Sequence, residues 1–373
     1  MEGKRFIRSL QLQNFLSYGS QGETIELRPL NVLIGTNASG KSNLIEAIAL
    51  LKATPTDLPA PIRQGGGISD FLWKGEKGIP TAKIETILDY PERAMPLRYQ
   101  ISFTTSGQRV EVVDEAIEDM EPRNSSESEP FFYYRYSDRG RPVINVTEDN
   151  EPQTRKLRTL RREDIIPDQS ILSQRKDPEQ YPELSYLGNT FADIGLYRNW
   201  QTGRDSVSRK AQQTDLPEHP LLEDGGNLGL VLNNLQYQLG SRQIIEKLKL
   251  FYDAAEELSI KIYGGTVQIF IRETGLIQPI PATREEPEIG LHPDILPAIA
   301  EMLIEASQRT QLIVTTHSDA LVSALSPESV LICDRDNRGS HLSRLDPERL
   351  KKWLENYSLG DLWRMGEIGG NRW

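Results

Sequence analysis

Apolar and polar residues alternate over residues 6–12, as expected for a half-buried β-strand. Residues 30–34 form a short apolar run that ends at Gly35, which predicts a second strand. Leucine and isoleucine then recur at helical spacing between Leu44 and Leu51, so we expect a helix from about Lys41.

The same pattern predicts the rest of an α/β fold. A polar and aromatic stretch from about residue 118 indicates an inserted, mainly helical lobe, which divides the chain into 1–117, 118–260 and 261–373. Further elements are expected as strands near 81–89, 97–105 and 109–114, loops at 118–129 and 202–226, a long amphipathic helix or helix pair over 227–259 broken near Gly240, a helix after Pro293, a strand at 311–315, a helix at 319–325, a strand at 329–333 and a helix from about 347.

A glycine-rich turn separates the second strand from the first helix. Its sequence, Gly35-Thr36-Asn37-Ala38-Ser39-Gly40-Lys41-Ser42, fits the phosphate-binding pattern G-x-x-x-x-G-K-[ST] in the strand–loop–helix setting that the pattern requires. Backbone N–H groups of such a turn curl around phosphates, and the helix dipole adds to the attraction. We therefore expect all eight residues to bind ATP, with Lys41 reaching the β- and γ-phosphates and Ser42 ligating Mg²⁺.

Two adjacent acids, Glu285 and Glu286, precede Pro287. Paired carboxylates suit phosphoryl transfer, because one can hold Mg²⁺ through its water shell while the other orients the attacking water. A charged helix start is the alternative interpretation of the same residues.

Two further polar residues are candidates on weaker signals. His317 follows the apolar run 311–315, where a neutral imidazole at the carboxyl end of a strand can hydrogen-bond a γ-phosphate. The alternative interpretation is that this histidine has a structural role. Gln64 precedes three glycines, which form either a plain turn or a mobile loop that brings the glutamine to the metal and the water.

The composition of the chain limits its compartment and its partners. The chain has 373 residues, a net charge of −11 and one cysteine, Cys333, so it has no internal disulfide and suits a reducing cytosol. No apolar run approaches the ~18 residues of a membrane span, and no membrane partner is expected. The acidic balance disfavours general adhesion to nucleic acid but leaves room for a local basic face. Basic residues are densest at Arg155, Lys156, Arg158, Arg161 and Arg162, and again at Arg198, Arg204, Arg209 and Lys210; solvated surface charge is the alternative for each group.

Together these segments resemble the ABC-type ATPase heads of the RecF/SMC class, nearest to stand-alone RecF-like ATPases without coiled coils. Residues 10–17 look like the first strand and turn of that class, and 35–42 match its Walker A loop. The ending Gly366-Glu367-Ile368-Gly369-Gly370-Asn371-Arg372-Trp373 is also similar. The resemblance implies an ABC-type P-loop head with an antiparallel β subdomain.

The resemblance also implies residue roles. Arg63-Gln64-Gly65 resembles the Q-loop, 285–287 the end of Walker B, 290–293 the D-loop and 316–318 the H-loop. On this basis Glu286, His317 and Gln64 are the expected catalytic residues, and Ser42, Gln64 and Glu285 the expected Mg²⁺ ligands.

One departure from the family pattern lies before the paired acids. Family members carry an ABC signature turn and an apolar Walker B strand there, but residues 278–284 contain two prolines and an arginine, which a buried central strand excludes. Either a segment is omitted between Arg284 and Glu285 or the protein lacks the element. We favour omission, and expect the flanking Cα atoms to lie much farther apart than the ~3.8 Å of a peptide link.

Two candidate functions follow, and the resemblance implies DNA as the partner in the first. In the first, ATP drives dimerisation of two copies, and hydrolysis releases a clamp that acts on DNA in repair or in defence against foreign DNA. In the second, the protein is a nucleotide-dependent sensor that controls a partner nuclease. The ATP-binding subunit of a transporter is disfavoured by the Arg63-Gln64-Gly65 context, the inserted lobe and the Glu285-Glu286 pair.

Overall fold

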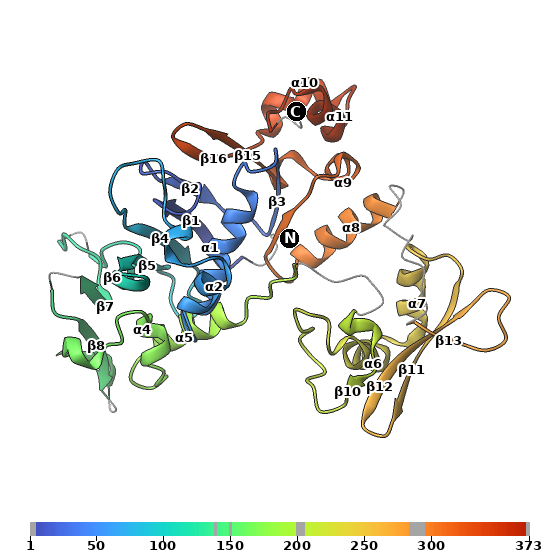
Figure 1. Cartoon of the computed structure of the whole chain (residues 1–373), viewed down its shortest axis with the longest axis horizontal. Helices are drawn as coiled ribbons and strands as arrows, with labels where there is room; N and C mark the ends of the chain where they lie inside the picture. The colour runs from blue at the N-terminus through green and yellow to red at the C-terminus, as the bar shows by residue number, and fades with distance from the viewer. Residues whose placement is uncertain are drawn as a thin grey trace. The chain divides into compact units, whose positions relative to one another are not determined.

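In the computed structural model of the chain, the described residues are 5–124, 126–137, 140–148, 151–198, 206–282 and 295–370. They fall into two units (Figure 1). Unit 1 comprises Met1–Ile194 and Ala300–Trp373, and unit 2 comprises Gly195–Ile299. Each unit is described by itself.

The described elements follow one another as strands and short helices. The strands are β1 (Ile7–Gln13), β2 (Glu23–Glu26), β3 (Leu30–Gly35), β4 (Ala82–Leu88), β5 (Leu97–Ser106), β6 (Arg109–Asp119), β7 (Phe132–Ser137), β8 (Val143–Glu148), β9 (Glu151–Thr159), β10 (Gln212–Gln213), β11 (Ala255–Tyr263), β12 (Thr266–Glu273), β13 (Ile280–Pro281), β14 (Leu312–Thr315), β15 (Val330–Asp336) and β16 (Gly339–Arg344). The helices are α1 (Lys41–Ala53), α2 (Pro59–Gln64), α3 (Ile68–Phe71), α4 (Ile171–Gln174), α5 (Pro182–Ala192), α6 (Leu228–Leu239), α7 (Ser241–Lys249), α8 (Leu296–Ser307), α9 (Asp319–Ser323), α10 (Pro347–Leu354) and α11 (Leu359–Met365), with 3₁₀ turns at Arg162–Asp164, Val207–Arg209 and Pro327–Ser329.

Unit 1 contains a long antiparallel sheet with the strand order β2-β1-β4-β5-β6-β7-β8-β9. Its strands alternate as the sequence predicted: in β4, Ala82, Ile84, Thr86 and Leu88 are buried and the residues between them are half-buried. The expected strands near 81–89, 97–105 and 109–114 are confirmed as β4, β5 and β6. This sheet is the antiparallel β subdomain.

A second sheet in unit 1 has the order β14-β3-β15-β16. Strand β3 pairs in parallel with β14 on one side and with β15 on the other. All six residues of β3 are buried, which explains why its sequence is a continuous apolar run rather than an alternating one. The predicted strands at 30–34, 311–315 and 329–333 are confirmed in this sheet.

The inserted lobe has different limits from those that the sequence predicted. Residues 118–194 belong to unit 1, because β6 continues to Asp119 and β7, β8 and β9 extend the antiparallel sheet. Tyr133 and Tyr134 of β7 are 0% and 1% exposed, so the aromatic patch that indicated a separate lobe is core of this sheet. Only the later part of the predicted lobe lies in unit 2.

Unit 2 combines two helices with an antiparallel sheet, in which β12 lies between β10 and β11 and also pairs with β13. The predicted helix pair is confirmed as α6 and α7, and the break falls at Gly240, whose φ is 84°. The helix predicted up to residue 259 ends at Lys249, and β11 begins at Ala255. Residues 255–259 were misassigned to a helix because their conformation depends on pairing with β12, and a local sequence pattern does not reveal such a partner.

A buried carboxylate joins the antiparallel sheet to the segment before α4. Glu115 of β6 accepts hydrogen bonds from the Tyr99 hydroxyl at 2.9 Å, from the Ser170 hydroxyl and from the Ile171 amide at 2.9 Å. Burial raises the pKa of Glu115 to about 7, against 4.5 for a free side chain, although the three donors act to lower it. The folded protein therefore keeps this proton up to a pH at which the unfolded chain has released it.

The stability of unit 1 should consequently fall as the pH rises from about 4.5 to about 7. We expect the free energy of unfolding to lose about 3 kcal/mol over this window, at about 1.4 kcal/mol for each pH unit that separates the two pKa values. Glu115→Gln should remove this slope, as measured by urea unfolding between pH 4 and 8. Glu111→Gln, on the same strand, should keep it; an unchanged slope in Glu115→Gln would show that another group carries the pH dependence.

Candidate functional site

The phosphate loop (residues 35–42) joins the buried strand β3 to helix α1, in the setting that the sequence predicted. Asn37 and Ala38 at its tip are exposed, whereas Ser39 and Lys41 are buried. The base of the loop is thus fixed in the core of unit 1, while its tip faces solvent.

Gly40 is required at its position for two reasons. Its φ is 112°, which L-residues rarely adopt, and a Cβ there would lie 2.3 Å from Ser340 Oγ and 2.8 Å from Ser17 Oγ. The Tyr18 hydroxyl also donates to the carbonyl oxygen of Gly40 at 3.1 Å. The turn into α1 therefore packs directly on β16 and on the segment after β1.

The amino-terminal end of α1 is open to an anion. Gly40 provides no side-chain cap, and the first turn contains no acidic residue. The first N–H groups of a helix have no intrahelical acceptor, and the helix dipole makes this end electropositive. Ser42 in this turn is exposed. The arrangement fits a phosphate group, with the Ser42 hydroxyl available to a bound cation.

Lys41 lies within the curve of the loop, 6% exposed. Its Nζ donates to the carbonyl oxygen of Gly35 at 2.8 Å and to that of Thr36 at 2.7 Å. Burial lowers the pKa of Lys41 from its usual value. A phosphate oxygen is a stronger partner for this ammonium than two neutral carbonyls, because the hydrogen bond is then charge-assisted at both ends.

Cys333 supports the loop from β15, a role that the sequence did not reveal. It pairs in register with Gly35, and its thiol donates to the carbonyl oxygen of Ser39 at 3.1 Å. Burial raises the pKa of the Cys333 thiol, so the neutral, donating form is favoured. The Ser39 hydroxyl is buried without a hydrogen-bond partner among the described residues, as expected for a group that meets a ligand at the loop.

His317 follows β14, which pairs with the strand that leads into the phosphate loop. Thr315 of β14 pairs with Leu33 of β3, and the Thr316 amide donates to the Leu33 carbonyl at 3.1 Å. Strand β14 ends at Thr315, so His317 lies two residues beyond its paired part, at the end of the sheet where β3 continues into the phosphate loop. The structure therefore brings this exposed histidine and the loop to the same edge of the sheet.

Gln64 is exposed at the end of α2, a helix that packs on α1. The segment after it returns to the core: the Phe71 carbonyl accepts from the Leu16 amide at 2.8 Å, and the rings of Phe71 and Phe15 lie 6.0 Å apart. The structure thus connects the Gln64 segment to the turn at Ser17 and Tyr18 beneath the loop. The roles of Gln64 towards the metal and the water stay predictions.

The paired acids Glu285 and Glu286 lie outside the described residues, as does the predicted break between Arg284 and Glu285. Among the described strands β14 pairs with β3 at the edge of its sheet, and its residues are half-buried or exposed although three of the four are apolar. Helix α8 is similarly uncovered, since Met302 and Ile304 are 38% and 40% exposed.

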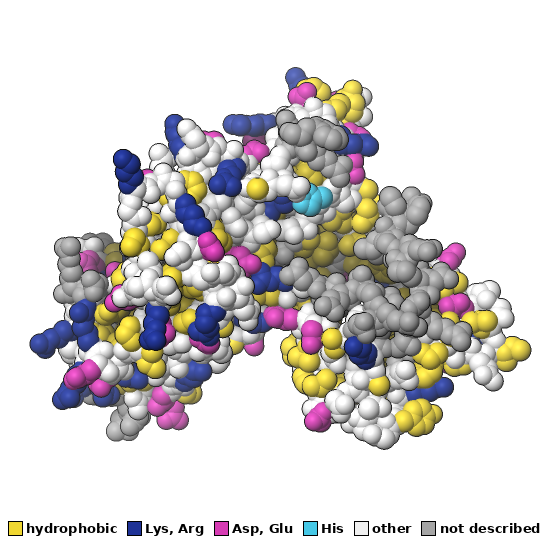
Figure 2. All heavy atoms as spheres, viewed as in Figure 1, with side chains coloured by type: hydrophobic (Ala, Val, Ile, Leu, Met, Phe, Trp, Pro, Cys, Tyr) yellow, Lys and Arg dark blue, Asp and Glu magenta, His cyan; other side chains and the backbone are white. Residues whose placement is uncertain are grey.

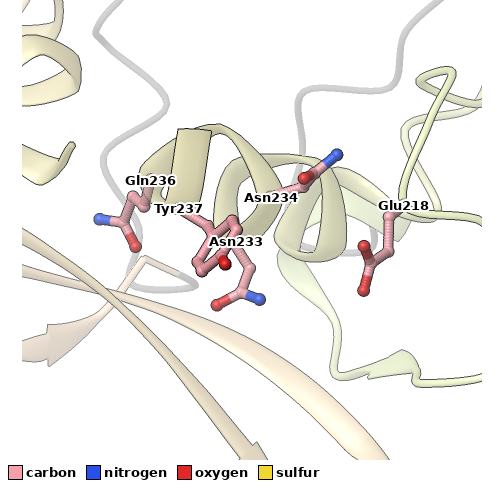
Figure 3. Close-up of a pocket in the computed structure, with 5 residues that line it drawn as sticks. All are labelled: Glu218, Asn233, Asn234, Gln236 and Tyr237. Atoms are coloured by element: carbon pink, nitrogen blue, oxygen red, sulfur yellow. The ribbon is translucent and has the colours of Figure 1, made fainter. Parts of the chain in front are cut away.

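Unit 2 has an open pocket of about 390 Å³ on α6 (Figure 3). It is lined by Glu218, Asn233, Asn234, Gln236 and Tyr237, and none of these is a predicted site residue. Its neutral amides and single carboxylate lack the positive charge that a triphosphate needs.

Within the described ranges, no cluster of three or more histidine, cysteine or acidic side chains forms a metal site. The predicted Mg²⁺ ligands Ser42, Gln64 and Glu285 are of another kind, and Glu285 lies beyond those ranges. In the part of the chain that the structure describes, no helix has the length and apolar character to cross a membrane.

Two family models match the chain. The model described as "AAA ATPase domain" matches residues 6–132, which contain the phosphate loop and Gln64. The model described as "AAA domain, putative AbiEii toxin, Type IV TA system" matches residues 285–323, which contain Glu285, Glu286 and His317. All predicted site residues therefore fall within the two matched ranges.

Similar proteins belong to two groups. The DNA replication and repair protein RecF of Limosilactobacillus fermentum is 36% identical over 106 residues, which are 28% of this chain and 25% of that protein. The chromosome partition protein Smc of Mycolicibacterium paratuberculosis is 28% identical over 104 residues, which are 26% of this chain and 8% of that protein. The aligned part thus spans a quarter or less of these relatives.

Solved structures resemble the chain over most of its length. An SMC head bound to the C-terminal winged-helix domain of ScpA has a TM-score of 0.53 at 15% identity, covering 93% of this chain and 100% of that one. A Pyrococcus furiosus Smc head with an extended coiled coil has a TM-score of 0.51 at 14% identity, covering 94% and 98%. At such identities the likeness establishes the fold, an ABC-type head with an antiparallel sheet, as the sequence predicted.

Proposed function

We propose that this chain, which resembles RecF/SMC-like ATPases of the ABC type, binds and hydrolyses ATP at the phosphate loop and that nucleotide controls its assembly into a homodimer acting on DNA. The proposal extends from a family of nucleotide-binding proteins to a specific activity of this one.

Each site residue has a proposed role. The N–H groups of residues 35–42 and the Lys41 ammonium hold the phosphates, and the Ser42 hydroxyl, Gln64 and Glu285 hold Mg²⁺, directly or through its water. Glu286 accepts a proton from the attacking water, and His317 donates a hydrogen bond to the γ-phosphate. When bound, Mg²⁺ neutralises the charge that develops on the phosphate oxygens.

The single observation that carries the proposal is the parallel pairing of β14 with β3. Because the two strands are parallel and end at the same edge of the sheet, the segments that follow them, one with His317 and one with the phosphate loop, both start from that edge although about 280 residues separate them in the sequence. Such an edge is where open α/β sheets bind their ligands. A chance match to the loop pattern would not require a polar partner at this position.

A basic surface supports DNA as the partner. Lys156 and Arg158, which share one face of β9, and the following Arg161 and Arg162 are all exposed. Figure 2 shows Lys and Arg side chains, with a few acids among them, gathering at the lower left, where Figure 1 places α4, β7 and β8. Arg155 does not belong to this surface, because its side chain is 8% exposed and pairs with Glu183 at 2.6 Å.

Reversing the charges of this surface tests the DNA role. We expect Lys156→Glu with Arg158→Glu to weaken ATP-dependent binding to a labelled duplex and to lower the slope of log K against log salt by about 2, at about 0.9 per lost phosphate contact. Fluorescence anisotropy at several salt concentrations measures both. ATP turnover should be unchanged, because these residues lie in the antiparallel sheet, away from the phosphate loop.

Lys351→Glu with Lys352→Glu is the matched control, since it makes the same charge change on exposed positions of α10. An equal loss of DNA affinity in both double variants would show that the effect comes from the change in net charge and not from the surface on β9. ATP turnover with no DNA binding by the unaltered protein would contradict the proposed action on DNA and favour the sensor that controls a partner nuclease.

A further inference from the structure

The last described part of the chain, residues 358–370, returns to the phosphate loop. This segment, the C-terminal clamp, consists of Ser358, helix α11 (Leu359–Met365) and the glycine-rich turn 366–370. Leu362 and Trp363 are 0% and 2% exposed, so the clamp is fixed in unit 1. The sequence marked this ending only as a point of resemblance, with no role.

One end of the clamp is fastened to α9. Gly360 approaches α9 so closely that a Cβ on it would lie 2.2 Å from the Asp319 carbonyl oxygen. Arg364 pairs with Asp319 at 3.3 Å, and the Ser358 and Ser323 hydroxyls lie 3.0 Å apart. Because α9 begins at Asp319, two residues after His317, α11 is attached to the turn that carries the histidine.

The chain then reverses at the end of α11. Gly366 has a φ of 81°, its amide donates to the Trp363 carbonyl at 3.1 Å, and the Glu367 amide donates to the Leu362 carbonyl at 3.0 Å. This pair of hydrogen bonds is a Schellman motif, which ends a helix and turns the chain back. The turn directs the following residues towards the ends of β3 and β15.

The other end of the clamp contacts the phosphate loop itself. The Gly370 amide donates to Asp334 Oδ1 at 3.1 Å, and the Gly370 carbonyl accepts from Trp363 Nε1 at 2.8 Å. With both polar groups held, Gly370 packs on Gly35: a Cβ on Gly370 would lie 3.2 Å from the Cα of Gly35. The carbonyl of that same Gly35 accepts the hydrogen bond from Lys41.

We propose that the C-terminal clamp is a positioning element of the nucleotide site, which holds Gly35 in a fixed place relative to the turn that carries His317. The inference rests on the proposed ATP site. Gly370 and Trp363 are its positioning residues, because they act on the loop through Gly35 and do not touch the phosphates. By thermodynamic linkage, a clamp that favours nucleotide binding is itself held more firmly when nucleotide is bound.

Gly370→Ala tests the contact directly. The added Cβ would lie 3.2 Å from both the Cα of Gly35 and Cγ2 of Ile332, so these neighbours must shift by a few tenths of an ångström. We expect the Kd for a fluorescent ATP analogue with Mg²⁺ to rise about tenfold, within the range of typical coupling between sites. Gly107→Ala is the matched control: its φ of 65° is close to the 61° of Gly370, but no atom lies within 4 Å of the added Cβ. Its Kd should equal that of the unaltered protein.

Trp363→Phe provides a second variant if Gly370→Ala fails to fold. It keeps a large ring in the core but removes the donor to Gly370, and should raise Kd in the same direction with little change in Tm. Hydrogen exchange provides a readout that a merely structural role would not move: in the unaltered protein, Mg²⁺-ATP should slow exchange of the Gly370 amide.

The outcomes separate the two proposals. The positioning role of the C-terminal clamp would be overturned by an unchanged Kd in Trp363→Phe, or in a folded Gly370→Ala, together with ATP-independent exchange at Gly370. The proposed ATP site would not be affected by this result. Failure of the unaltered protein to bind ATP would overturn both. Weaker binding in both variants, normal binding in Gly107→Ala and slowed exchange at Gly370 would establish the clamp.

Discussion

Replacing Lys41 by alanine should reduce ATP turnover by about 10²–10³-fold, the usual cost of removing one preorganised donor to the charge of a transition state. Lys41 donates to the carbonyls of Gly35 and Thr36 inside the curve of the loop, so its ammonium is already where a β- or γ-phosphate oxygen is expected. Its lowered pKa shows that the charge is held at some cost, which a phosphate partner offsets. Phosphate release at saturating Mg²⁺-ATP measures the loss.

Lys52→Ala is the matched control, because Lys52 lies in the last turn of the same helix and donates to the Ile194 carbonyl at 2.6 Å. It lies about 16 Å from Lys41 along the helix axis, at about 1.5 Å per residue, so it should affect stability but not turnover. Equal turnover in Lys41→Ala and in the unaltered protein would mean that the loop is not the hydrolytic site.

The sequence predicted β3, the phosphate loop and α1 correctly because local pattern and local chemistry coincide there. An apolar run ends at a glycine, a helical repeat begins, and the loop pattern lies between them, so few other folds fit these residues. The strand before His317 was predictable for a similar reason, since it is a short apolar run, while the role of His317 stays a prediction.

The parts that the sequence did not reveal depend on contacts between distant residues. Cys333 and Gly370 support the loop from about 300 residues away, and no local pattern marks a thiol or a glycine as a neighbour of Gly35. Arg155 was grouped with its basic neighbours, but the alternation of β9 turns it towards Glu183. The segment 118–194 was separated from the sheet because its aromatic residues were not recognised as strand β7.

Glu286→Gln should have the second large effect. Glutamine matches glutamate in shape and still hydrogen-bonds water, but it cannot accept a proton, so hydrolysis should fall by about 10²–10⁴-fold, the usual contribution of a general base. ATP binding should persist, because the phosphate loop and Lys41 are unaltered. We therefore expect Mg²⁺-ATP to trap a long-lived dimer, detected by light scattering alongside slow phosphate release.

Comparison with two other variants makes this result decisive. Glu288→Gln, two residues along the same acidic run, carries no predicted role and should turn over ATP normally. Lys41→Ala should neither hydrolyse ATP nor dimerise with it, since it loses the interaction with the phosphates on which dimerisation depends. A dimer in Glu286→Gln alone would separate binding from hydrolysis, whereas normal hydrolysis in this variant would remove Glu286 from the site. If Glu286→Gln binds ATP but stays a monomer, the chain lacks the surface that completes the two-subunit site. The resemblance implies that this surface comes from the segment before Glu285.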